Sequence, residues 1–180
     1  MSHNRFPAVY LLHGLGGSPN GSVLQLQTEL ASLSKDQTYL RPLMPHADSS
    51  VAPSVSVEHL KALELPEGAL VVGISMGGLV GAKLQEQERP DLHVFCINSP
   101  TWAVDVELHH RMSNRVSLYS SRDRVIAGRT EQWSALAEAY DLPWLSGHDT
   151  DPHKQALAQI LCGYLSGHTV SSTLEHMNDR

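Results

Sequence analysis

Short apolar runs alternate with amphipathic segments along most of the chain. The runs are continuous in Val, Leu and Ile rather than alternating with polar residues, which is typical of strands buried on both faces of a parallel sheet. The run at 69–74 is the most continuous, whereas Pro42 predicts an early end for the second run. We therefore expect an α/β fold with about six mostly parallel strands flanked by helices. The six runs lie at 8–12, 38–44, 69–74, 93–98, 115–120 and, most weakly, 143–145.

The segments between these runs carry apolar residues at helical spacing, with one face apolar and the other polar. Ser22 is the expected N-cap of the first helix, and Pro66 and Pro90 stop the second and third. The segment after the last helix is polar, so we expect a single domain over residues 1–166 and a frayed tail over 167–180. The expected helices lie at 22–33, 57–65, 77–88, 130–140 and 154–165.

Composition favours a globular domain and argues against two classes of partner. The 180 residues are 41% hydrophobic and 18% charged, which suits one domain with enough apolar residues for a core. Thirteen Lys and Arg against nineteen Asp and Glu give a net charge of -6. Nucleic acids and anionic membranes favour basic patches, so neither is expected as the main partner. Cys96 and Cys162 are too few for a disulfide framework or a four-thiolate zinc site.

The chain carries no membrane or export signal that we can identify. No stretch approaches the roughly 20 apolar residues needed to cross a bilayer, so no membrane insertion is expected. The start of the chain lacks the apolar run and small-residue cleavage site of a signal peptide. We therefore expect the protein in the cytoplasm.

Residues 73–77 are Gly-Ile-Ser-Met-Gly, which matches the G-x-S-x-G nucleophile elbow. The motif sets a serine on a very sharp turn between a strand and a helix, where side chains two residues away would clash. The turn lifts the hydroxyl above the sheet and directs the N-terminus of the next helix at the reacting atoms. The pentapeptide alone is a weak signal, but here it follows the best strand and opens a helix, as the motif requires. Ser75 is therefore the candidate nucleophile, against the alternative of a small-residue turn that only packs helix on sheet.

A glycine-rich turn ends the first run, where residues 11–18 are Leu-Leu-His-Gly-Leu-Gly-Gly-Ser. Acyl transfer needs two N–H donors directed at the developing oxyanion. Met76, directly after the nucleophile, can supply one, and we assign the second to Leu15 in this turn. A phosphate-binding loop is the weaker alternative, because the Lys-Ser/Thr ending of a P-loop and the full dinucleotide fingerprint are both missing.

A serine nucleophile needs a base, and the base needs an acid that orients it. Asp123 follows the fifth run where the strand opens into a loop, although aspartate is also common there as a turn or cap residue. His148 lies after the sixth run, and we prefer it to His153, which can fall in the first turn of the last helix. Asp105 is a reserve candidate for the acid. The order Ser75, Asp123, His148 is the sequence order of one known class of triad.

Other residues of chemical interest have simpler explanations. The eleven histidines include the pair His109 and His110, but no recognised metal-ligand spacing is present, so no metal is expected. His13 is expected to be structural because it precedes the oxyanion turn. Cys96 lies inside the fourth run and is expected to be a small buried hydrophobe rather than a nucleophile.

Together these segments resemble the α/β-hydrolase superfamily. The resemblance spans about residues 8–166, and it implies a compact, parallel-rich sheet with Ser75 as nucleophile, His148 as base and Asp123 as acid. It is specific to the superfamily but to no substrate. The segments that carry it are the His-Gly turn at 13–17, the elbow at 73–78, residues 121–126 (Ser-Arg-Asp-Arg-Val-Ile) and the pair at 147–148.

The chain differs from the larger members of this superfamily in two ways. It starts with the strand that leads to the His-Gly turn, so two leading antiparallel strands are expected to be missing. Only about sixteen residues, 100–115, separate the fourth and fifth runs, where larger relatives insert a helical cap. We therefore expect no cap domain, as in small, lidless esterases. An open site buries long acyl chains poorly, so we expect short acyl or small aryl esters, with Trp102 as one aromatic wall.

The expected reaction is acyl transfer from a small-molecule ester to water, with no metal or organic cofactor. A thioesterase or an acyltransferase with the same triad is the alternative among enzymes. A catalytically silent binding protein on the same fold is the alternative from another class. The complete set of Ser, Asp, His and glycine turn stands against that last alternative.

Overall fold

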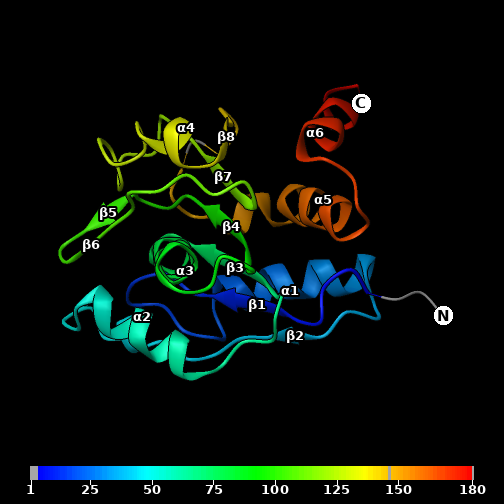
Figure 1. Cartoon of the computed structure of the whole chain (residues 1–180). Coiled ribbons are helices and arrows are strands. Elements are labelled where there is room, and N and C mark those ends of the chain that lie inside the picture. Colours follow the sequence, from blue (N-terminus) through cyan, green and yellow to red (C-terminus); the bar gives the residue numbers. More distant parts are fainter. Residues whose placement is uncertain (1–3, 146, 180) are drawn as a thin grey trace.

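Six strands form one sheet in which every neighbouring pair is parallel. The computed structural model of the chain describes residues 4–145 and 147–179. In their order across the sheet the strands are β2 (Tyr39–Leu40), β1 (Val9–Leu12), β3 (Leu70–Ile74), β4 (His93–Ile97), β7 (Arg115–Tyr119) and β8 (Glu138–Asp141). This sheet and the helices around it (Figure 1) confirm the predicted α/β fold.

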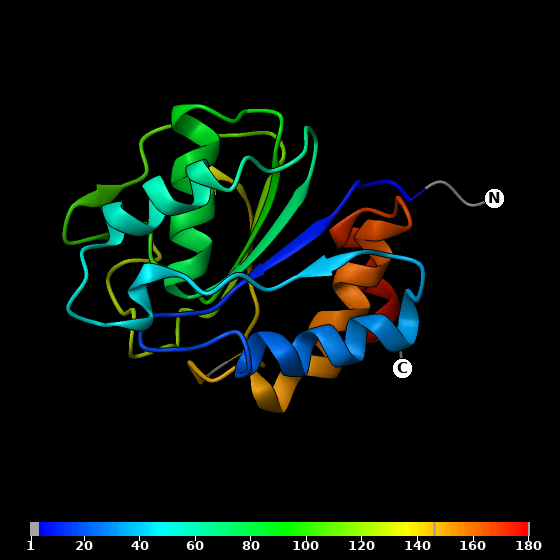
Figure 2. The ribbon, with the colours of Figure 1, turned by 90° about the horizontal axis from the view of Figure 1, so that it is seen from below.

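Helices cover both faces of the sheet, as Figure 2 shows. One face carries α1 (Ser22–Leu33) and α5 (Lys154–Leu165), with α6 (Val170–Asn178) against α5, and the other carries α2 (Pro53–Ala62) and α3 (Met76–Gln87). Along β1, Val9 and Leu11 pack into the core beneath α1 and α5, whereas Leu12 packs into the core beneath α2 and α3. Burial on both faces explains why the strands are continuous apolar runs. None of the described helices is both long enough and apolar enough to cross a membrane.

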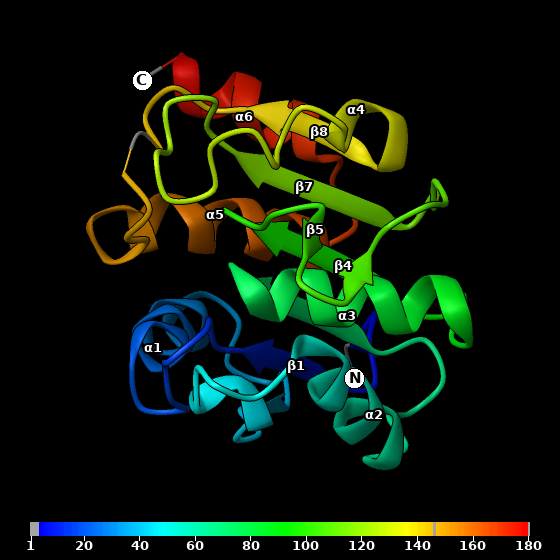
Figure 3. The same ribbon diagram turned by 90° about the vertical axis from the view of Figure 1, so that its left-hand side faces the viewer.

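A small hairpin occupies the connection between β4 and β7. Its strands, β5 (Trp102–Ala103) and β6 (Val106–Glu107), pair antiparallel and form a separate two-stranded sheet (Figure 3). Asp105, in the turn of the hairpin, accepts hydrogen bonds from the main-chain N–H and the hydroxyl of Ser54 in α2. No helix forms between residues 100 and 115 of the described chain, in agreement with the absence of a helical cap predicted from the sequence.

The region after β7 differs from the prediction. The helix expected at 130–140 is limited to α4 (Trp133–Leu136), and the sixth strand is β8 rather than the run at 143–145. The residues of β8 are Glu-Ala-Tyr-Asp, which are half-buried or exposed because the strand forms one edge of the sheet. Pairing with β7 therefore determines this strand, and its own apolar pattern does not. Pro143 lies in the turn that follows β8.

Three smaller predictions also need correction. The second strand is limited to β2, two residues long, where 38–44 was expected. Ser22 is the first residue of α1 rather than its N-cap, which is Gly21. The tail expected to fray from 167 onward instead forms α6. The side chain of Thr169 caps this helix by accepting the Ser172 N–H, and Val170 is buried against the core.

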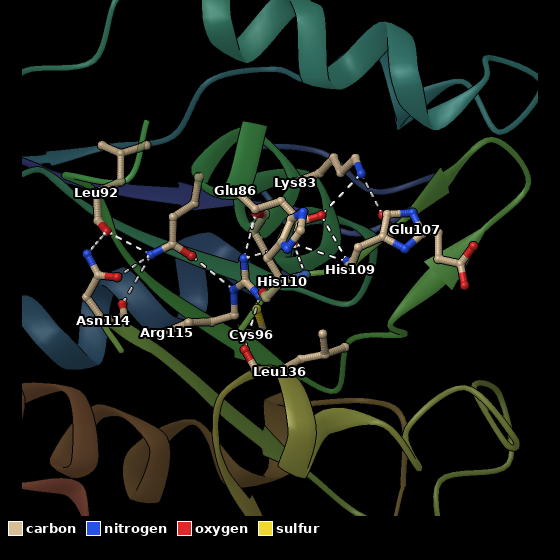
Figure 4. Close-up of polar contacts among 12 residues, drawn as sticks. Lys83, Glu86, Leu92, Cys96, Glu107, His109, His110, Asn114, Arg115 and Leu136 are labelled. Atoms are coloured by element: carbon tan, nitrogen blue, oxygen red, sulfur yellow. Dashed lines mark hydrogen bonds and ion pairs between the residues drawn. The ribbon is translucent and has the colours of Figure 1, made fainter. Parts of the chain in front are cut away.

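A buried ion pair joins the start of β7 to α3 (Figure 4). Glu86 of α3 lies 3.5 Å from the guanidinium of Arg115, whose side chain is fully buried. The Glu86 carboxylate also accepts the main-chain N–H groups of His109 and His110, and Lys83 lies 3.2 Å from it. The histidine pair is thus held by its backbone, and no cluster of metal-binding side chains is found among the described residues. Arg115 donates further hydrogen bonds to the Gln85 side chain and the main-chain oxygens of Ala82, His110 and Leu136.

Candidate active site

Ser75 lies on a sharp turn between β3 and α3, as the elbow motif predicts. Its backbone has φ 52° and ψ −119°, a left-handed conformation that is strained for a residue with a side chain. A Cβ on Gly73 would lie 2.1 Å from the backbone nitrogen of Gly78. A Cβ on Gly77 would lie 2.4 Å from the main-chain oxygen of Leu12. Neither distance is sterically possible, so both glycines of the motif are required for the turn to form.

Two hydrogen bonds join Ser75, His148 and Asp123. Nε2 of His148 lies 3.0 Å from Oγ of Ser75, and Nδ1 of His148 lies 2.7 Å from Oδ2 of Asp123. The Asp123 side chain is fully buried, whereas that of His148 is 26% exposed. Asp123 accepts through its other oxygen the main-chain N–H of Val125, at 2.9 Å, which fixes the plane of the carboxylate. A carboxylate can only accept, so Nδ1 carries the proton and Nε2 is free to accept the Ser75 hydroxyl.

The topology explains how residues far apart in sequence meet. Ser75 directly follows β3, Asp123 follows β7 by a few residues, and His148 lies in the loop after β8. Because parallel strands end at the same edge of a sheet, all three are brought to one edge. The structure brings His148 rather than His153 to Asp123, since His153 packs against the ring of Trp144.

The reserve acid lies elsewhere. Asp105 is in the β5–β6 hairpin and bonds to Ser54, so among the described contacts it has none with either candidate histidine. Cys96 is fully buried in β4, and burial raises the pKa of its thiol to about 12, which keeps it protonated. It is therefore part of the core, as expected.

The glycine turn after β1 runs against Ser75. A Cβ on Gly14 would lie 3.4 Å from the Cβ of Ser75. The N–H of Gly16 is bonded to the main-chain oxygen of His46, and that of Gly17 to the oxygen of Gly14. Within the described residues, the N–H groups of Leu15 and Met76, the two expected oxyanion donors, have no protein acceptor, and both residues line the cavity that contains Ser75.

Two buried histidines, His13 and His46, form hydrogen bonds with the backbone of this turn. His13 accepts the Met44 N–H at Nε2, at 3.0 Å, and its Nδ1 lies 2.8 Å from the oxygen of Gly14. Nε2 of His46 lies 2.8 Å from the oxygen of His13, and Nδ1 of His46 lies 2.8 Å from the hydroxyl of Ser56. Burial lowers the pKa of His46 to about 4, against the opposing effect of its bond to His13, so the ring is neutral. His13 is structural, as expected.

Sequence reasoning misses the roles of His46 and Asn98. His46 follows a weak second run in a Pro-His turn, where a histidine has no special signal. Asn98 directly follows β4, has φ 48°, is fully buried, and donates to the main-chain oxygens of Gly147 and His148. An asparagine after a strand suggests only a turn, because the loop that it contacts lies 50 residues away in sequence.

The cavity beside Ser75 has a volume of about 560 Å³, which suits a small molecule. Among the described lining residues, Arg129 carries a positive charge and Asp149 a negative one. Trp102 does not line the cavity, so the expectation that it forms an aromatic wall is wrong. The guanidinium of Arg129 instead stacks on the Trp102 ring. The apolar lining residues are Leu15, Ile74, Met76, Pro100, Val125 and Ile126.

No protein-family model matches the chain, and no curated sequence matches it either. Several solved structures match it in fold. Alpha/beta hydrolase domain-containing protein 10 from mouse has a TM-score of 0.67 at 10% identity, covering 92% of this chain and 90% of the mouse chain. Est1E from Butyrivibrio proteoclasticus, with ferulic acid bound, has a TM-score of 0.64 at 12% identity, covering 91% of this chain and 90% of that one.

A third structure, a pyrethroid hydrolase from Sphingobium faniae JZ-2, has a TM-score of 0.63 at 9% identity and covers 88% of this chain and 97% of that one. All three match nearly full length. At such low identities the similarity concerns the fold. The chain has the α/β-hydrolase fold.

Proposed function

We propose that the protein is a serine hydrolase that cleaves carboxylic esters of small molecules through an acyl-enzyme intermediate. The observation that carries this proposal is the chain of hydrogen bonds from Asp123 through His148 to Ser75, with distances of 2.7 and 3.0 Å. A nucleophile within reach of a base that is itself oriented by a buried acid is the arrangement that activates a serine hydroxyl. A protein that only binds a ligand does not require this arrangement.

In the acylation half, His148 Nε2 takes the proton of the Ser75 hydroxyl as Oγ attacks the ester carbonyl carbon. The carbonyl oxygen becomes an oxyanion, which the N–H groups of Leu15 and Met76 stabilise. The intermediate then collapses, the bond to the alcohol oxygen breaks, and the leaving alcohol takes the proton from His148. Asp123 keeps the imidazole oriented and stabilises its charged form.

In the deacylation half, a water molecule gives its proton to His148 and attacks the acyl carbon. The second oxyanion collapses, the bond to Ser75 Oγ breaks, and the serine recovers its proton from His148. The products are a carboxylic acid and the free serine. Every proton that moves and every bond that breaks in these steps is accounted for by Ser75, His148, the ester and water.

Small substrates fit this proposal best. The cavity of about 560 Å³ has six apolar side chains in its lining, and the hairpin at β5 and β6 supplies no helical cap above it. Short acyl or small aryl esters match such a site. Two proteins of the same fold support an ester or small acid as ligand, because Est1E binds ferulic acid and the Sphingobium enzyme is a pyrethroid hydrolase.

The test combines a covalent probe with one pair of serine variants. A fluorophosphonate should label the native protein on Ser75, and Ser75→Ala should abolish labelling and lower hydrolysis of 4-nitrophenyl acetate by at least about 1,000-fold. Ser32→Ala is the matched control, because Ser32 is exposed on α1 and does not line the cavity. It should retain both signals. Wild-type turnover by folded Ser75→Ala, or no adduct on the native protein, would overturn the proposal. A parallel thioester substrate separates an esterase from a thioesterase.

A further inference from the structure

Arg129 lies in the lining of the cavity that contains Ser75. Its backbone is fixed at both ends: its N–H donates to the oxygen of Ile126 at 3.0 Å, and its oxygen accepts the N–H of Thr101 at 2.8 Å. Its guanidinium carbon lies 4.5 Å from the centroid of the Trp102 ring. The loop after β7 and the hairpin at β5 thus hold this side chain between them.

The positive charge of Arg129 is not neutralised within the described part of the chain. The Lys and Arg ion pairs there involve other residues, and the guanidinium of Arg129 donates to no protein acceptor among the described contacts. Stacking on an aromatic ring restrains a guanidinium but leaves its N–H groups free to donate. Arg115 shows the contrast, since every part of its buried guanidinium is bonded to protein oxygens.

The remainder of the cavity makes this charge significant. Six side chains of the lining are apolar, and among the described lining residues Asp149 carries the only carboxylate. Asp149 accepts the main-chain N–H of Asp151, at 3.0 Å, and belongs to the loop that carries His148. The negative charge of Asp149 disfavours an anion beside that loop, whereas the positive charge of Arg129 favours an anion beside its own loop. A half-buried guanidinium that is restrained by an aromatic ring is well suited to bind a planar carboxylate through two parallel hydrogen bonds.

We propose that Arg129 is the anion-binding residue of this site, and that the substrates are esters that carry a carboxylate. The single charge of a carboxylate matches one guanidinium, whereas a phosphate dianion would leave a charge uncompensated. This inference rests on the proposed esterase function and specifies its substrate class. The carboxylate belongs to the part of the ester that occupies the Arg129 side of the cavity, which is either the acyl chain or the alcohol.

Two matched pairs of esters test the inference. In the first pair, 4-acetoxybenzoate carries the carboxylate on the leaving group, and its methyl ester is the neutral partner. In the second, the half-ester of adipic acid with 4-nitrophenol carries it on the acyl chain, and methyl 4-nitrophenyl adipate is neutral. Wild-type kcat/KM should favour the charged member of at least one pair. Arg129→Gln should lower kcat/KM for that member by about 10- to 100-fold and for its neutral partner by less than about twofold.

The control is Arg122→Gln, which removes an exposed arginine of the same loop that does not line the cavity. It should leave the preference intact, and Arg129→Lys should retain part of it. An equal effect of Arg129→Gln on both members, or a wild-type preference for both neutral esters, would overturn the inference. If no ester is hydrolysed faster than by Ser75→Ala, the proposed function itself fails. If the neutral esters are hydrolysed and neither charged ester is preferred, only the proposed role of Arg129 fails.

Discussion

The side-chain amide of Asn98 donates hydrogen bonds to the main-chain oxygens of Gly147, at 3.3 Å, and His148, at 3.2 Å. Its own N–H donates to the oxygen of Leu118 in β7, at 2.9 Å, and the preceding residue, Ile97, accepts the N–H of Ser75 at 2.8 Å. The end of β4 therefore connects the nucleophile turn, the strand that leads to Asp123 and the loop of His148. We infer that Asn98 is a positioning residue for His148.

Replacing Asn98 by glycine should lower kcat by about 10- to 100-fold with little change in KM, because small misplacements of a base are costly. Glycine tolerates the φ of 48°, so this variant removes the amide without straining the backbone. Steady-state kinetics and the rate of fluorophosphonate labelling should fall together while the melting temperature changes little. Asn98→Asp, which has the same shape but no N–H donor, should show a similar loss. Unchanged kcat in both variants would mean that the His148 loop needs no such anchor.

The two candidate histidines should behave differently on substitution. His148→Ala should lower kcat/KM by about 100- to 10,000-fold, since it removes the proposed general base. His153 packs against the ring of Trp144 and should tolerate alanine with less than about a twofold loss. Hydrolysis of 4-nitrophenyl acetate by both purified variants makes the comparison. A large loss with His153→Ala alone would transfer the role of base to that residue.

The elbow and its surroundings could be predicted because their constraints are local. Gly73 and Gly77 are required by atoms within a few residues or on the adjacent strand, so the pentapeptide itself carries the signal. Asn98 and His46 could not be predicted, because their functions depend on loops brought near by the fold. The network of His46, His13 and Ser56 joins three separate segments, and the sequence of each is unremarkable.

The errors in secondary structure have the same origin. Residues 138–141 lack a strand pattern and become β8 only because β7 offers an edge to pair with. The tail looked polar as a whole, yet Val170, Leu174 and Met177 recur at helical spacing and pack on the core. Gly163 allows the close approach, since a Cβ there would lie 2.5 Å from Thr173 of α6. The spacing of Val170, Leu174 and Met177 is itself a helical signal in the sequence.

The neutral state of His46 predicts a loss of stability in acid. Burial lowers the pKa of His46 from 6.5 to about 4, so between these values the unfolded chain binds the proton and the folded protein does not. The free energy of unfolding should therefore be independent of this group above pH 6.5 and should decrease as the pH falls toward 4. Linkage gives a loss of about 2 kcal/mol between pH 7 and pH 5.

Urea unfolding at the two pH values measures this loss, and His46→Gln is the comparison. Glutamine cannot take the proton, so the variant should lose about 2 kcal/mol less than the wild type across the same interval, whatever its stability at pH 7. Equal losses in the two proteins would show that His46 does not control acid sensitivity.

The absence of a helical cap predicts how the rate depends on acyl length. The hairpin at β5 and β6 is tied to Ser54 through Asp105, and the cavity beside Ser75 has room for a small molecule only. Each methylene that is truly buried contributes roughly 0.8 kcal/mol, or about fourfold in kcat/KM. For neutral 4-nitrophenyl esters, kcat/KM should therefore rise over the first few carbons and then level off, with no increase when the substrate exceeds its solubility. Measurements from acetate to decanoate, below and above that limit, test this. A steady rise to long chains, or activation by emulsified ester, would require a covered acyl groove. Arg129→Gln should leave this neutral series unchanged, because the apolar lining alone binds the chain.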